Sequence, residues 1–144
     1  MYALGRIMAI DYGTKRTGIA VTDPMQMIAS PLDTVLTHDL MNFLESYLEE
    51  EEVEMLVVGE PKQMNAMDSA SLTQIRFFVE AFKKRFKELP VQWVDERFTS
   101  RMAMDAMIEG GMKKSDRQKK GNVDKVSAAL ILQTYLESRN KPPE

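Results

Sequence analysis

The sequence predicts one α/β domain built on a five-stranded mixed sheet with helices on both faces. Two kinds of apolar run lead to this prediction. Residues 7–10 and 19–21 are apolar at every position and flank a glycine-bounded turn, which is typical of buried strands that pair as a hairpin. The runs 55–59 and 91–94 each follow a helical pattern, as strands in α/β units do. Three antiparallel strands followed by alternating helices and strands give a mixed sheet.

The segment after the hairpin predicts an edge strand and an amphipathic helix. The strand is expected over residues 25–35, because Pro24 and Pro31 cannot donate hydrogen bonds to a central ladder. Thr37 or Asp39 can cap the helix that follows. Its apolar stripe repeats at helical spacing in Leu40, Phe43, Leu44, Tyr47 and Leu48.

The next helix is long and amphipathic. It is expected to begin at Asp68 or Ser69, and its apolar face is made of Leu72, Ile75, Val79, Phe82 and Phe86. The strand 91–94 then follows Pro90 and alternates apolar with polar residues, so we expect it near an edge of the sheet.

The C-terminal third predicts two more helices separated by a polar loop. The first helix is expected from residue 99 or 100 to the glycine pair 110–111, which can form a C-cap. The lysine-rich stretch 112–121 is expected to be a loop, and Asn122 to cap a last helix that ends near Glu137. We therefore expect a single domain over residues 1–138 and a disordered tail over residues 139–144.

The composition limits the class of protein. The 144 residues are 44% apolar and 28% charged, as in ordinary globular proteins. No cysteine is present, which excludes disulfides and thiolate metal sites and fits a reducing compartment. No long uncharged apolar run and no signal-peptide pattern are found, so we expect a cytoplasmic protein without a membrane partner. The net charge of −3 argues, on average, against a nucleic-acid partner.

Three carboxylates lie at the ends of predicted elements. Asp11 ends the first strand, Glu96 follows the last strand, and Asp124 lies in the first turn of the last helix. Converging carboxylates repel one another unless a cation holds them, and an all-oxygen ligand set favours Mg²⁺ or Mn²⁺. Each acid also has a structural explanation: a turn cap for Asp11, a pair with Arg97 or Arg101 for Glu96, and the helix dipole for Asp124.

Basic residues gather around these acids despite the negative net charge. Lys15 and Arg16 follow Asp11 closely, and further basic residues are concentrated in one later stretch: Arg97, Arg101, Lys113, Lys114, Arg117, Lys119, Lys120 and Lys125. A positive surface around an acidic centre suits a polyanion that is held by its phosphates and cut at a metal. The alternative for residues 113–120 is a solvated loop without a ligand.

Four blocks of the sequence resemble the YqgF (RuvX-like) family. They occur in the family's order and spacing and extend over nearly the whole chain: AIDYGTKRTGIAVTD (9–23), VVGEP (57–61), VDERFTS (94–100) and VDKVSAALILQTYL (123–136). The resemblance implies a ribonuclease H-like fold related to Holliday-junction resolvases. It also implies a nuclease that matures the 5′ end of the 16S ribosomal RNA precursor, with branched DNA as the alternative substrate.

The resemblance also implies roles for individual residues. Asp11, Glu96 and Asp124 would be both the catalytic positions and the ligands of a divalent metal, Mg²⁺ or Mn²⁺. The expected phosphate contacts are Lys15, Arg16, Arg97 and Lys125. The chain departs from the family pattern at residues 60–68, where Glu60 replaces an aliphatic residue. Glu60 is therefore either a further acid near the metal or a loop residue.

Two other functions remain open from the sequence. The chain can be a ribosome-assembly factor that binds structured RNA and cuts nothing. It can also be a fragment of an ATPase, because residues 11–14 resemble the first phosphate loop of actin-like kinases, although those enzymes need two such domains. The sequence leaves open whether RNA or branched DNA is bound, and whether the protein is a monomer or a weak homodimer.

Overall fold

The computed structural model describes residues 5–60, 69–95 and 120–140. They form β1 (Arg6–Asp11), β2 (Arg16–Thr22), β3 (Ala29–Leu36), the 3₁₀ turn η1 (Thr37–Asp39), α1 (Leu40–Glu50), β4 (Val53–Glu60), α2 (Ser69–Arg85), β5 (Val91–Asp95) and α5 (Lys120–Asn140). The helix expected over 99–109 and residues 112–119 of the expected loop lie outside the described residues.

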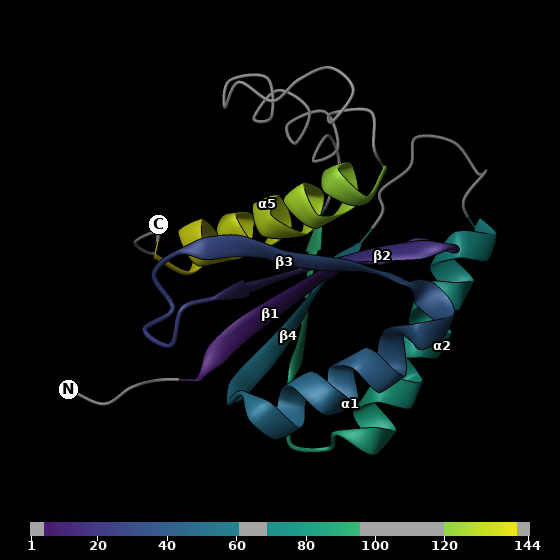
Figure 1. Cartoon of the computed structure of the whole chain (residues 1–144), viewed down its shortest axis with the longest axis horizontal. Coiled ribbons are helices and arrows are strands. Elements are labelled where there is room, and N and C mark those ends of the chain that lie inside the picture. Colours follow the sequence, from purple (N-terminus) through teal and green to yellow (C-terminus); the bar gives the residue numbers. More distant parts are fainter. Residues whose placement is uncertain (1–4, 61–68, 96–119, 141–144) are drawn as a thin grey trace.

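The five strands form one mixed sheet in the order β3-β2-β1-β4-β5 (Figure 1). β1 pairs antiparallel with β2, and β2 pairs antiparallel with β3. β4 lies parallel to β1 on one side and to β5 on the other. The sheet class and the edge positions of β3 and β5 confirm the expectations from the sequence. The carboxyl ends of β1, β4 and β5 therefore lie at one edge of the sheet.

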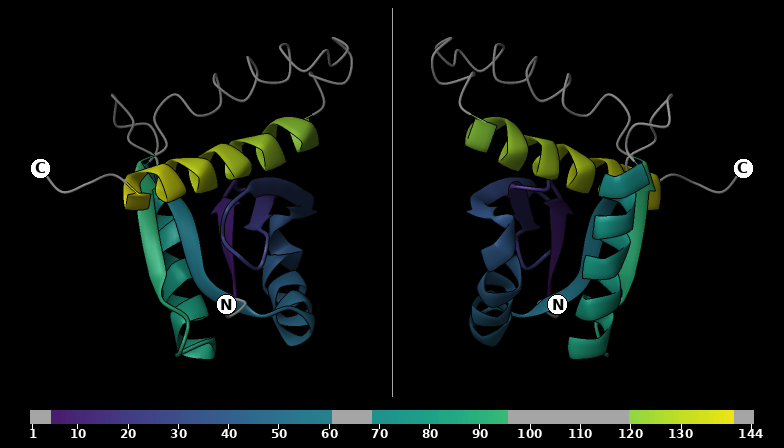
Figure 2. Two further views of the ribbon diagram at one scale, coloured as in Figure 1. Left: turned by 90° about the vertical axis from the view of Figure 1, so that its left-hand side faces the viewer. Right: turned by 90° about the vertical axis from the view of Figure 1, so that its right-hand side faces the viewer.

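The sheet separates two apolar layers (Figure 2). Alternate residues of β1 point to opposite faces: Met8 and Ile10 pack with α1 and α2, whereas Ile7 and Ala9 pack with α5. These four side chains are at most 2% exposed, as expected for a central strand buried on both faces. None of the helices in the described ranges is long and apolar enough to span a membrane.

Helix α5 is longer than the sequence predicts. It begins at Lys120, within the expected loop 112–121, and ends at Asn140, within the expected tail 139–144. The C-terminal extension has a clear cause. Arg139 donates from Nη1 to the Gln26 side-chain oxygen at 2.7 Å and from Nη2 to the Gln26 carbonyl at 3.3 Å. This anchor holds the last turn of the helix against the loop between β2 and β3.

The expected caps of α1 are not used as caps. Asp39 occupies the N-cap position, but its side chain makes no capping hydrogen bond. The hydroxyl of Thr37 donates instead to the carbonyl of Gly13, in the turn between β1 and β2. His38 is exposed on the same 3₁₀ turn. The start of α1 is thus tied to the hairpin, which matters for the site described below.

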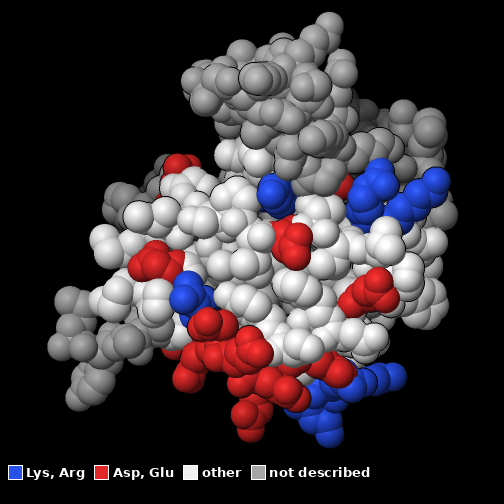
Figure 3. All heavy atoms as spheres, viewed as in Figure 1, with Lys and Arg blue, Asp and Glu red and all other residues white. Residues whose placement is uncertain are grey.

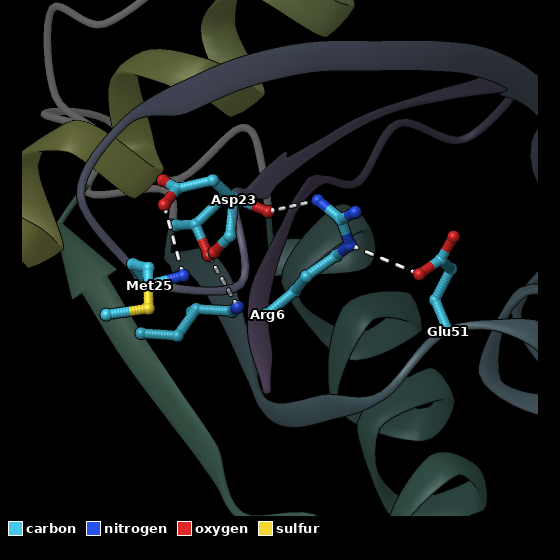
Figure 4. Close-up of polar contacts among 6 residues, drawn as sticks. Arg6, Asp23, Met25 and Glu51 are labelled. Carbon is cyan, nitrogen blue, oxygen red and sulfur yellow. Dashed lines mark hydrogen bonds and ion pairs between the residues drawn. The ribbon is translucent and has the colours of Figure 1, made fainter. Parts of the chain in front are cut away.

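β3 begins later than expected, at Ala29 instead of residue 25, because Asp23 organises a turn before it. The Asp23 carboxylate accepts hydrogen bonds from the amides of Met25 (3.1 Å), Met27 (2.9 Å) and Ile28 (2.7 Å). Figure 4 shows this turn beside Arg6, which reaches the Thr22 carbonyl and Glu51. A segment whose amides face one carboxylate cannot also form a strand ladder.

Asp23→Asn should lower the melting temperature at pH 7, and the difference should shrink in acid. The hydrogen bond from the Ile28 amide, helped by those from Met27 and Met25, lowers the pKa of the Asp23 carboxyl below its ordinary value. A lowered folded-state pKa adds stability above the unfolded pKa of about 3.9, and this stability is lost as the pH falls through the folded pKa. Thermal unfolding of both proteins between pH 3 and pH 7 tests this.

Asp33→Asn is the matched control, because it removes the same charge from an exposed position on the same hairpin, where Asp33 Oδ1 accepts from the neighbouring Thr34 amide. Its difference from the wild type should stay small over the whole range. A gap between Asp23→Asn and the wild type that is constant with pH would show that the ionised carboxylate is not what stabilises the turn.

Candidate functional site

The alternation of β1 places Asp11 on the face that α5 covers. Asp11 lies two residues after Ala9, which packs against α5, and it is the register partner of Gly18 on β2. Directly opposed residues of an antiparallel pair have their side chains on the same face of the sheet. Tyr12 points the other way and packs on Phe78 of α2, with ring centroids 5.6 Å apart. Burial there raises the pKa of the Tyr12 phenol.

The first turns of α5 lie directly against Gly18 of the sheet. A Cβ atom placed on Gly18 would lie 2.0 Å from the carbonyl oxygen of Asp124 and 2.7 Å from the amide nitrogen of Lys125. Only a residue without a Cβ allows this close approach. Asp11 is the register partner of Gly18 in the sheet. The backbone of Asp124 packs on Gly18 from the face that α5 covers. The structure therefore brings Asp11 and Asp124 to neighbouring positions on one face, although 113 residues of sequence separate them (124 − 11).

Arg16 lies on the same face, two residues before Gly18. Its Nε atom is 3.9 Å from Oδ2 of Asp124, and the two side chains are 36% and 29% exposed. The separation is that of a loose ion pair and exceeds a hydrogen-bond distance. Within the described part of the chain, Arg16 Nε is enclosed by protein and has no hydrogen-bond acceptor. Arg16 thus places a positive charge beside Asp124, and its Nε–H donor makes no hydrogen bond within the described residues.

Two threonines hold the turn between β1 and β2, which carries Lys15 and leads into Arg16. Thr37 donates its hydroxyl to the Gly13 carbonyl at 2.6 Å and its amide to the Lys15 carbonyl at 2.8 Å. The fully buried Thr17 contacts the Thr37 hydroxyl at 2.9 Å. Since Thr37 uses its one hydroxyl proton on Gly13, Thr17 must be the donor in this contact. The turn that carries Lys15 and Arg16 is therefore fixed from both ends by the residue that begins η1.

Thr37→Val should loosen the basic turn without unfolding the protein. The change keeps the shape of the side chain but leaves the Gly13 carbonyl and the Thr17 hydroxyl without their partner, which costs about 1–3 kcal/mol. Chemical denaturation measures this loss. Hydrogen exchange at the amide of residue 37, which bonds to the Lys15 carbonyl, should become faster.

Thr37→Ser is the matched control, because it keeps the hydroxyl and removes only a methyl group. It should retain slow exchange at residue 37. Equal exchange rates in the valine variant and the wild type would contradict a role of the hydroxyl in holding the turn.

The other predicted site residues lie in different places relative to Asp11 and Asp124. Lys15 is exposed on the turn, and Lys125 is half-buried next to Gly18. Glu60 is the last residue of β4 and follows Val58, which packs with α1 and α2, so alternation assigns Glu60 to the face opposite Asp11. This position argues against Glu60 as a further acid near the metal. Glu96, Arg97 and residues 113–119 lie outside the described residues.

A third acid is needed to complete the predicted metal site. Among residues 5–60, 69–95 and 120–140 no group of three potential ligands lies close enough to hold a metal ion. Asp11 and Asp124 supply two carboxylates on one face. Glu96 directly follows Asp95, the last residue of β5, in the sequence and lies outside the described residues. Its role in the site stays a prediction.

Sequence reasoning missed three residues that shape the site. The sequence predicts Gly18 only as part of a hairpin turn and Thr37 only as a possible helix cap. Ser127, three residues after Asp124 on α5, is fully buried, and its hydroxyl has no hydrogen-bond partner in the described part of the chain. The spacing of three between Asp124 and Ser127, which puts both on one side of a helix, was the available signal.

Figure 3 shows acidic and basic side chains on one face of the molecule, with one mixed group and one mainly basic group. Acidic side chains gather at the end where α1 finishes, and residues Glu49, Glu50 and Glu52 there are exposed. A group of basic side chains lies at the other end of this face, on the side of the turn between β1 and β2. The basic residues Lys84, Arg85 and Lys87 lie beside the acidic group at the end of α1, whereas the basic group near the turn is the one next to the candidate site.

Known proteins resemble this chain in sequence and in fold. A protein of Bacteroides thetaiotaomicron named "Putative pre-16S rRNA nuclease" is 57% identical over 136 residues, which cover 94% of this chain and 99% of that protein. A protein of the same name from Phocaeicola vulgatus is 54% identical over 136 residues, which cover 94% of this chain and 98% of that protein.

The structure titled "T. thermophilus RuvC in complex with Holliday junction substrate" matches with a TM-score of 0.59 at 15% identity and covers 94% of this chain and 95% of that chain. This likeness confirms the ribonuclease H-like fold that the sequence motifs implied. A family model described as RuvX, Holliday junction resolvase, matches residues 5–138, and the chain therefore belongs to the RuvX family.

Proposed function

We propose that the protein is a metal-dependent endonuclease that hydrolyses phosphodiester bonds of structured nucleic acid. The observation that carries this proposal is the convergence at Gly18, where the register partner Asp11 and the backbone of Asp124 meet on one face. Two carboxylates beside a basic turn suit a cation and the phosphate that it polarises. Membership in the RuvX family supports the same activity.

The residues present fit a hard divalent cation. Asp11 and Asp124 offer only oxygen donors, and the chain contains no cysteine and a single histidine, which lies exposed on η1. Such a ligand set selects Mg²⁺ or Mn²⁺ over softer metals. Asp11 and Asp124 would hold the ion, and Glu96 would complete the ligand set. When bound, the ion would polarise the phosphodiester and favour the hydroxide form of a water molecule.

The protein groups would hold the substrate in line with this ion. Lys15 and Arg16 sit on a turn that Thr37 fixes, so their charges are preorganised for a phosphate. Lys125 follows Asp124 in the first turns of α5, close to Gly18. Arg97 would add a further contact. These residues would bind the backbone, which gives affinity without base specificity.

The substrate supported best is the 5′ end of precursor 16S rRNA. The support comes from curated relatives of 57% and 54% identity that carry the name "Putative pre-16S rRNA nuclease". The second candidate is a four-way DNA junction, which the description of the matching family model favours. We place both activities in the cytoplasm, since the chain has no cysteine that an oxidising compartment would convert to disulfides.

The experiment is a side-by-side cleavage assay. Purified protein is given an rRNA precursor and a four-way junction, each with Mg²⁺, Mn²⁺ or a chelator. Metal-dependent cleavage of the precursor near its mature 5′ end is the expected result. Cleavage of the junction alone would favour the resolvase. Tight RNA binding without cleavage under any of these conditions would favour an assembly factor and overturn the nuclease.

A further inference from the structure

Arg16 differs from Arg6 and Arg139, whose side chains are held by hydrogen bonds. Arg6 donates to the Thr22 carbonyl at 2.9 Å, and Arg139 donates to Gln26 at 2.7 Å. Arg16 has no such anchor for its Nε atom, which is enclosed and lacks a hydrogen-bond acceptor within the described part of the chain. Its recorded partner is Asp124 at 3.9 Å. The Nε atom of Arg16 is thus close to a negative charge but makes no hydrogen bond within the described part of the chain.

The backbone of Arg16 is fixed while its side chain can move. Arg16 pairs with Leu36 of β3, and its carbonyl packs so closely against Gly13 that a Cβ there would lie 2.3 Å from the oxygen. The side chain is 36% exposed. Rotation of the long Arg16 side chain can therefore break the Arg16–Asp124 pair without movement of the sheet.

We propose that Arg16 is a displaceable counter-ion of Asp124, which a divalent cation at Asp11 and Asp124 releases to bind a substrate phosphate. This inference rests on the metal site of the proposed function. Without the cation, Arg16 offsets the repulsion between two neighbouring carboxylates. At 3.9 Å the two atoms are too far apart for a hydrogen bond, so the pair is weak and a divalent cation competes with Arg16 successfully. The released guanidinium then has donors in the fork geometry that suits a phosphate.

This arrangement couples metal binding to substrate binding. Arg16 competes with the cation for Asp124, and it contributes fully to phosphate binding only after the cation has displaced it. The cation should therefore strengthen nucleic-acid binding through Arg16, and nucleic acid should strengthen cation binding by the same factor. Loss of Arg16 should have opposite effects on the two ligands, which a merely structural role would not produce.

The first test titrates Mn²⁺ alone into the full chain by calorimetry. Arg16→Gln should bind Mn²⁺ about threefold to tenfold more tightly than the wild type, because a competing positive charge next to Asp124 is gone. Lys15→Gln removes the same charge from the neighbouring exposed position and should change Mn²⁺ affinity by less than about twofold. Arg16→Lys keeps the charge and should stay close to the wild type.

The second test measures binding of a labelled RNA duplex by fluorescence anisotropy, with Ca²⁺ or with a chelator. Calcium should strengthen binding to the wild type, and most of this gain should be absent in Arg16→Gln. Melting temperatures of all variants confirm that each is folded. If the glutamine variant binds Mn²⁺ no more tightly than the wild type, or if Lys15→Gln tightens Mn²⁺ binding equally, the displacement mechanism is wrong.

The outcomes separate this inference from the proposed function. If the wild type binds Mn²⁺ and Asp11→Asn abolishes that binding, the metal site stands whatever Arg16 does. An unchanged affinity in Arg16→Gln then overturns only the counter-ion role. If the wild type binds no divalent cation, both proposals fail together.

Discussion

Asp11→Asn is expected to reduce phosphodiester cleavage by more than about a hundredfold while leaving the fold intact, because loss of groups that merely support a metal ligand already costs about 10- to 100-fold. The change removes the negative charge of Asp11, the register partner of Gly18, and keeps the size of the side chain. It also weakens the proposed metal site at its most constrained position, at the end of a strand that is buried on both faces.

Binding of nucleic acid should survive this change. The proposed phosphate contacts come from the basic turn and from α5, and Asp11→Asn makes the surroundings less negative. Cleavage rates and RNA affinity measured on the same preparation would show the separation. Asp33→Asn removes the same charge from an exposed position on the edge strand β3 and should cleave normally. Undiminished cleavage by purified Asp11→Asn would remove Asp11 from the catalytic set.

The fold could be predicted because its strongest signals are local. Residues 7–10 and 55–59 are continuous apolar runs, and only a strand covered by helices on both faces needs every side chain to be apolar. Their order with the amphipathic helices leaves few sheet topologies. The start of β3 and the end of α5 are harder to predict. They depend on hydrogen bonds of Asp23 and Arg139 to residues that secondary-structure propensities do not take into account.

The site could be predicted only in part, because its assembly depends on the register of the sheet. The sequence marks Asp11 and Asp124 as acids at element ends, but nothing local says that Gly18 will pair with the first and support the second. The hydroxyl of Thr37 is a similar case. It looks like a helix cap in the sequence, but it donates to the carbonyl of Gly13, 24 residues earlier.

Gly18→Ala should destabilise the protein and separate the two carboxylates, and it is the second change with a large expected effect. A glycine-to-alanine change in a strand ordinarily gains about 0.4–1 kcal/mol, because it restricts the unfolded chain. Here the added methyl would lie 2.0 Å from the Asp124 carbonyl oxygen, far inside van der Waals contact. Overpacking typically costs about 1–3 kcal/mol, and a contact this close with backbone belongs at the upper end, so the sign of the effect reverses.

Gly18→Ala should differ from a variant that only loses stability, because the structure must move to make room for the methyl group. Because β2 is a central strand, α5 must move away, and its first turns carry Asp124 and Lys125 with it. We therefore expect weaker Mn²⁺ binding and weaker cleavage even at temperatures where the variant is fully folded. Ala20→Gly is the control: this buried residue lies two positions along the same strand and faces the same helix. Losing its methyl lowers stability without pushing α5 outward, so Mn²⁺ affinity should be kept. Equal Mn²⁺ affinity in Gly18→Ala and the wild type would show that the metal site does not depend on the close contact between β2 and α5.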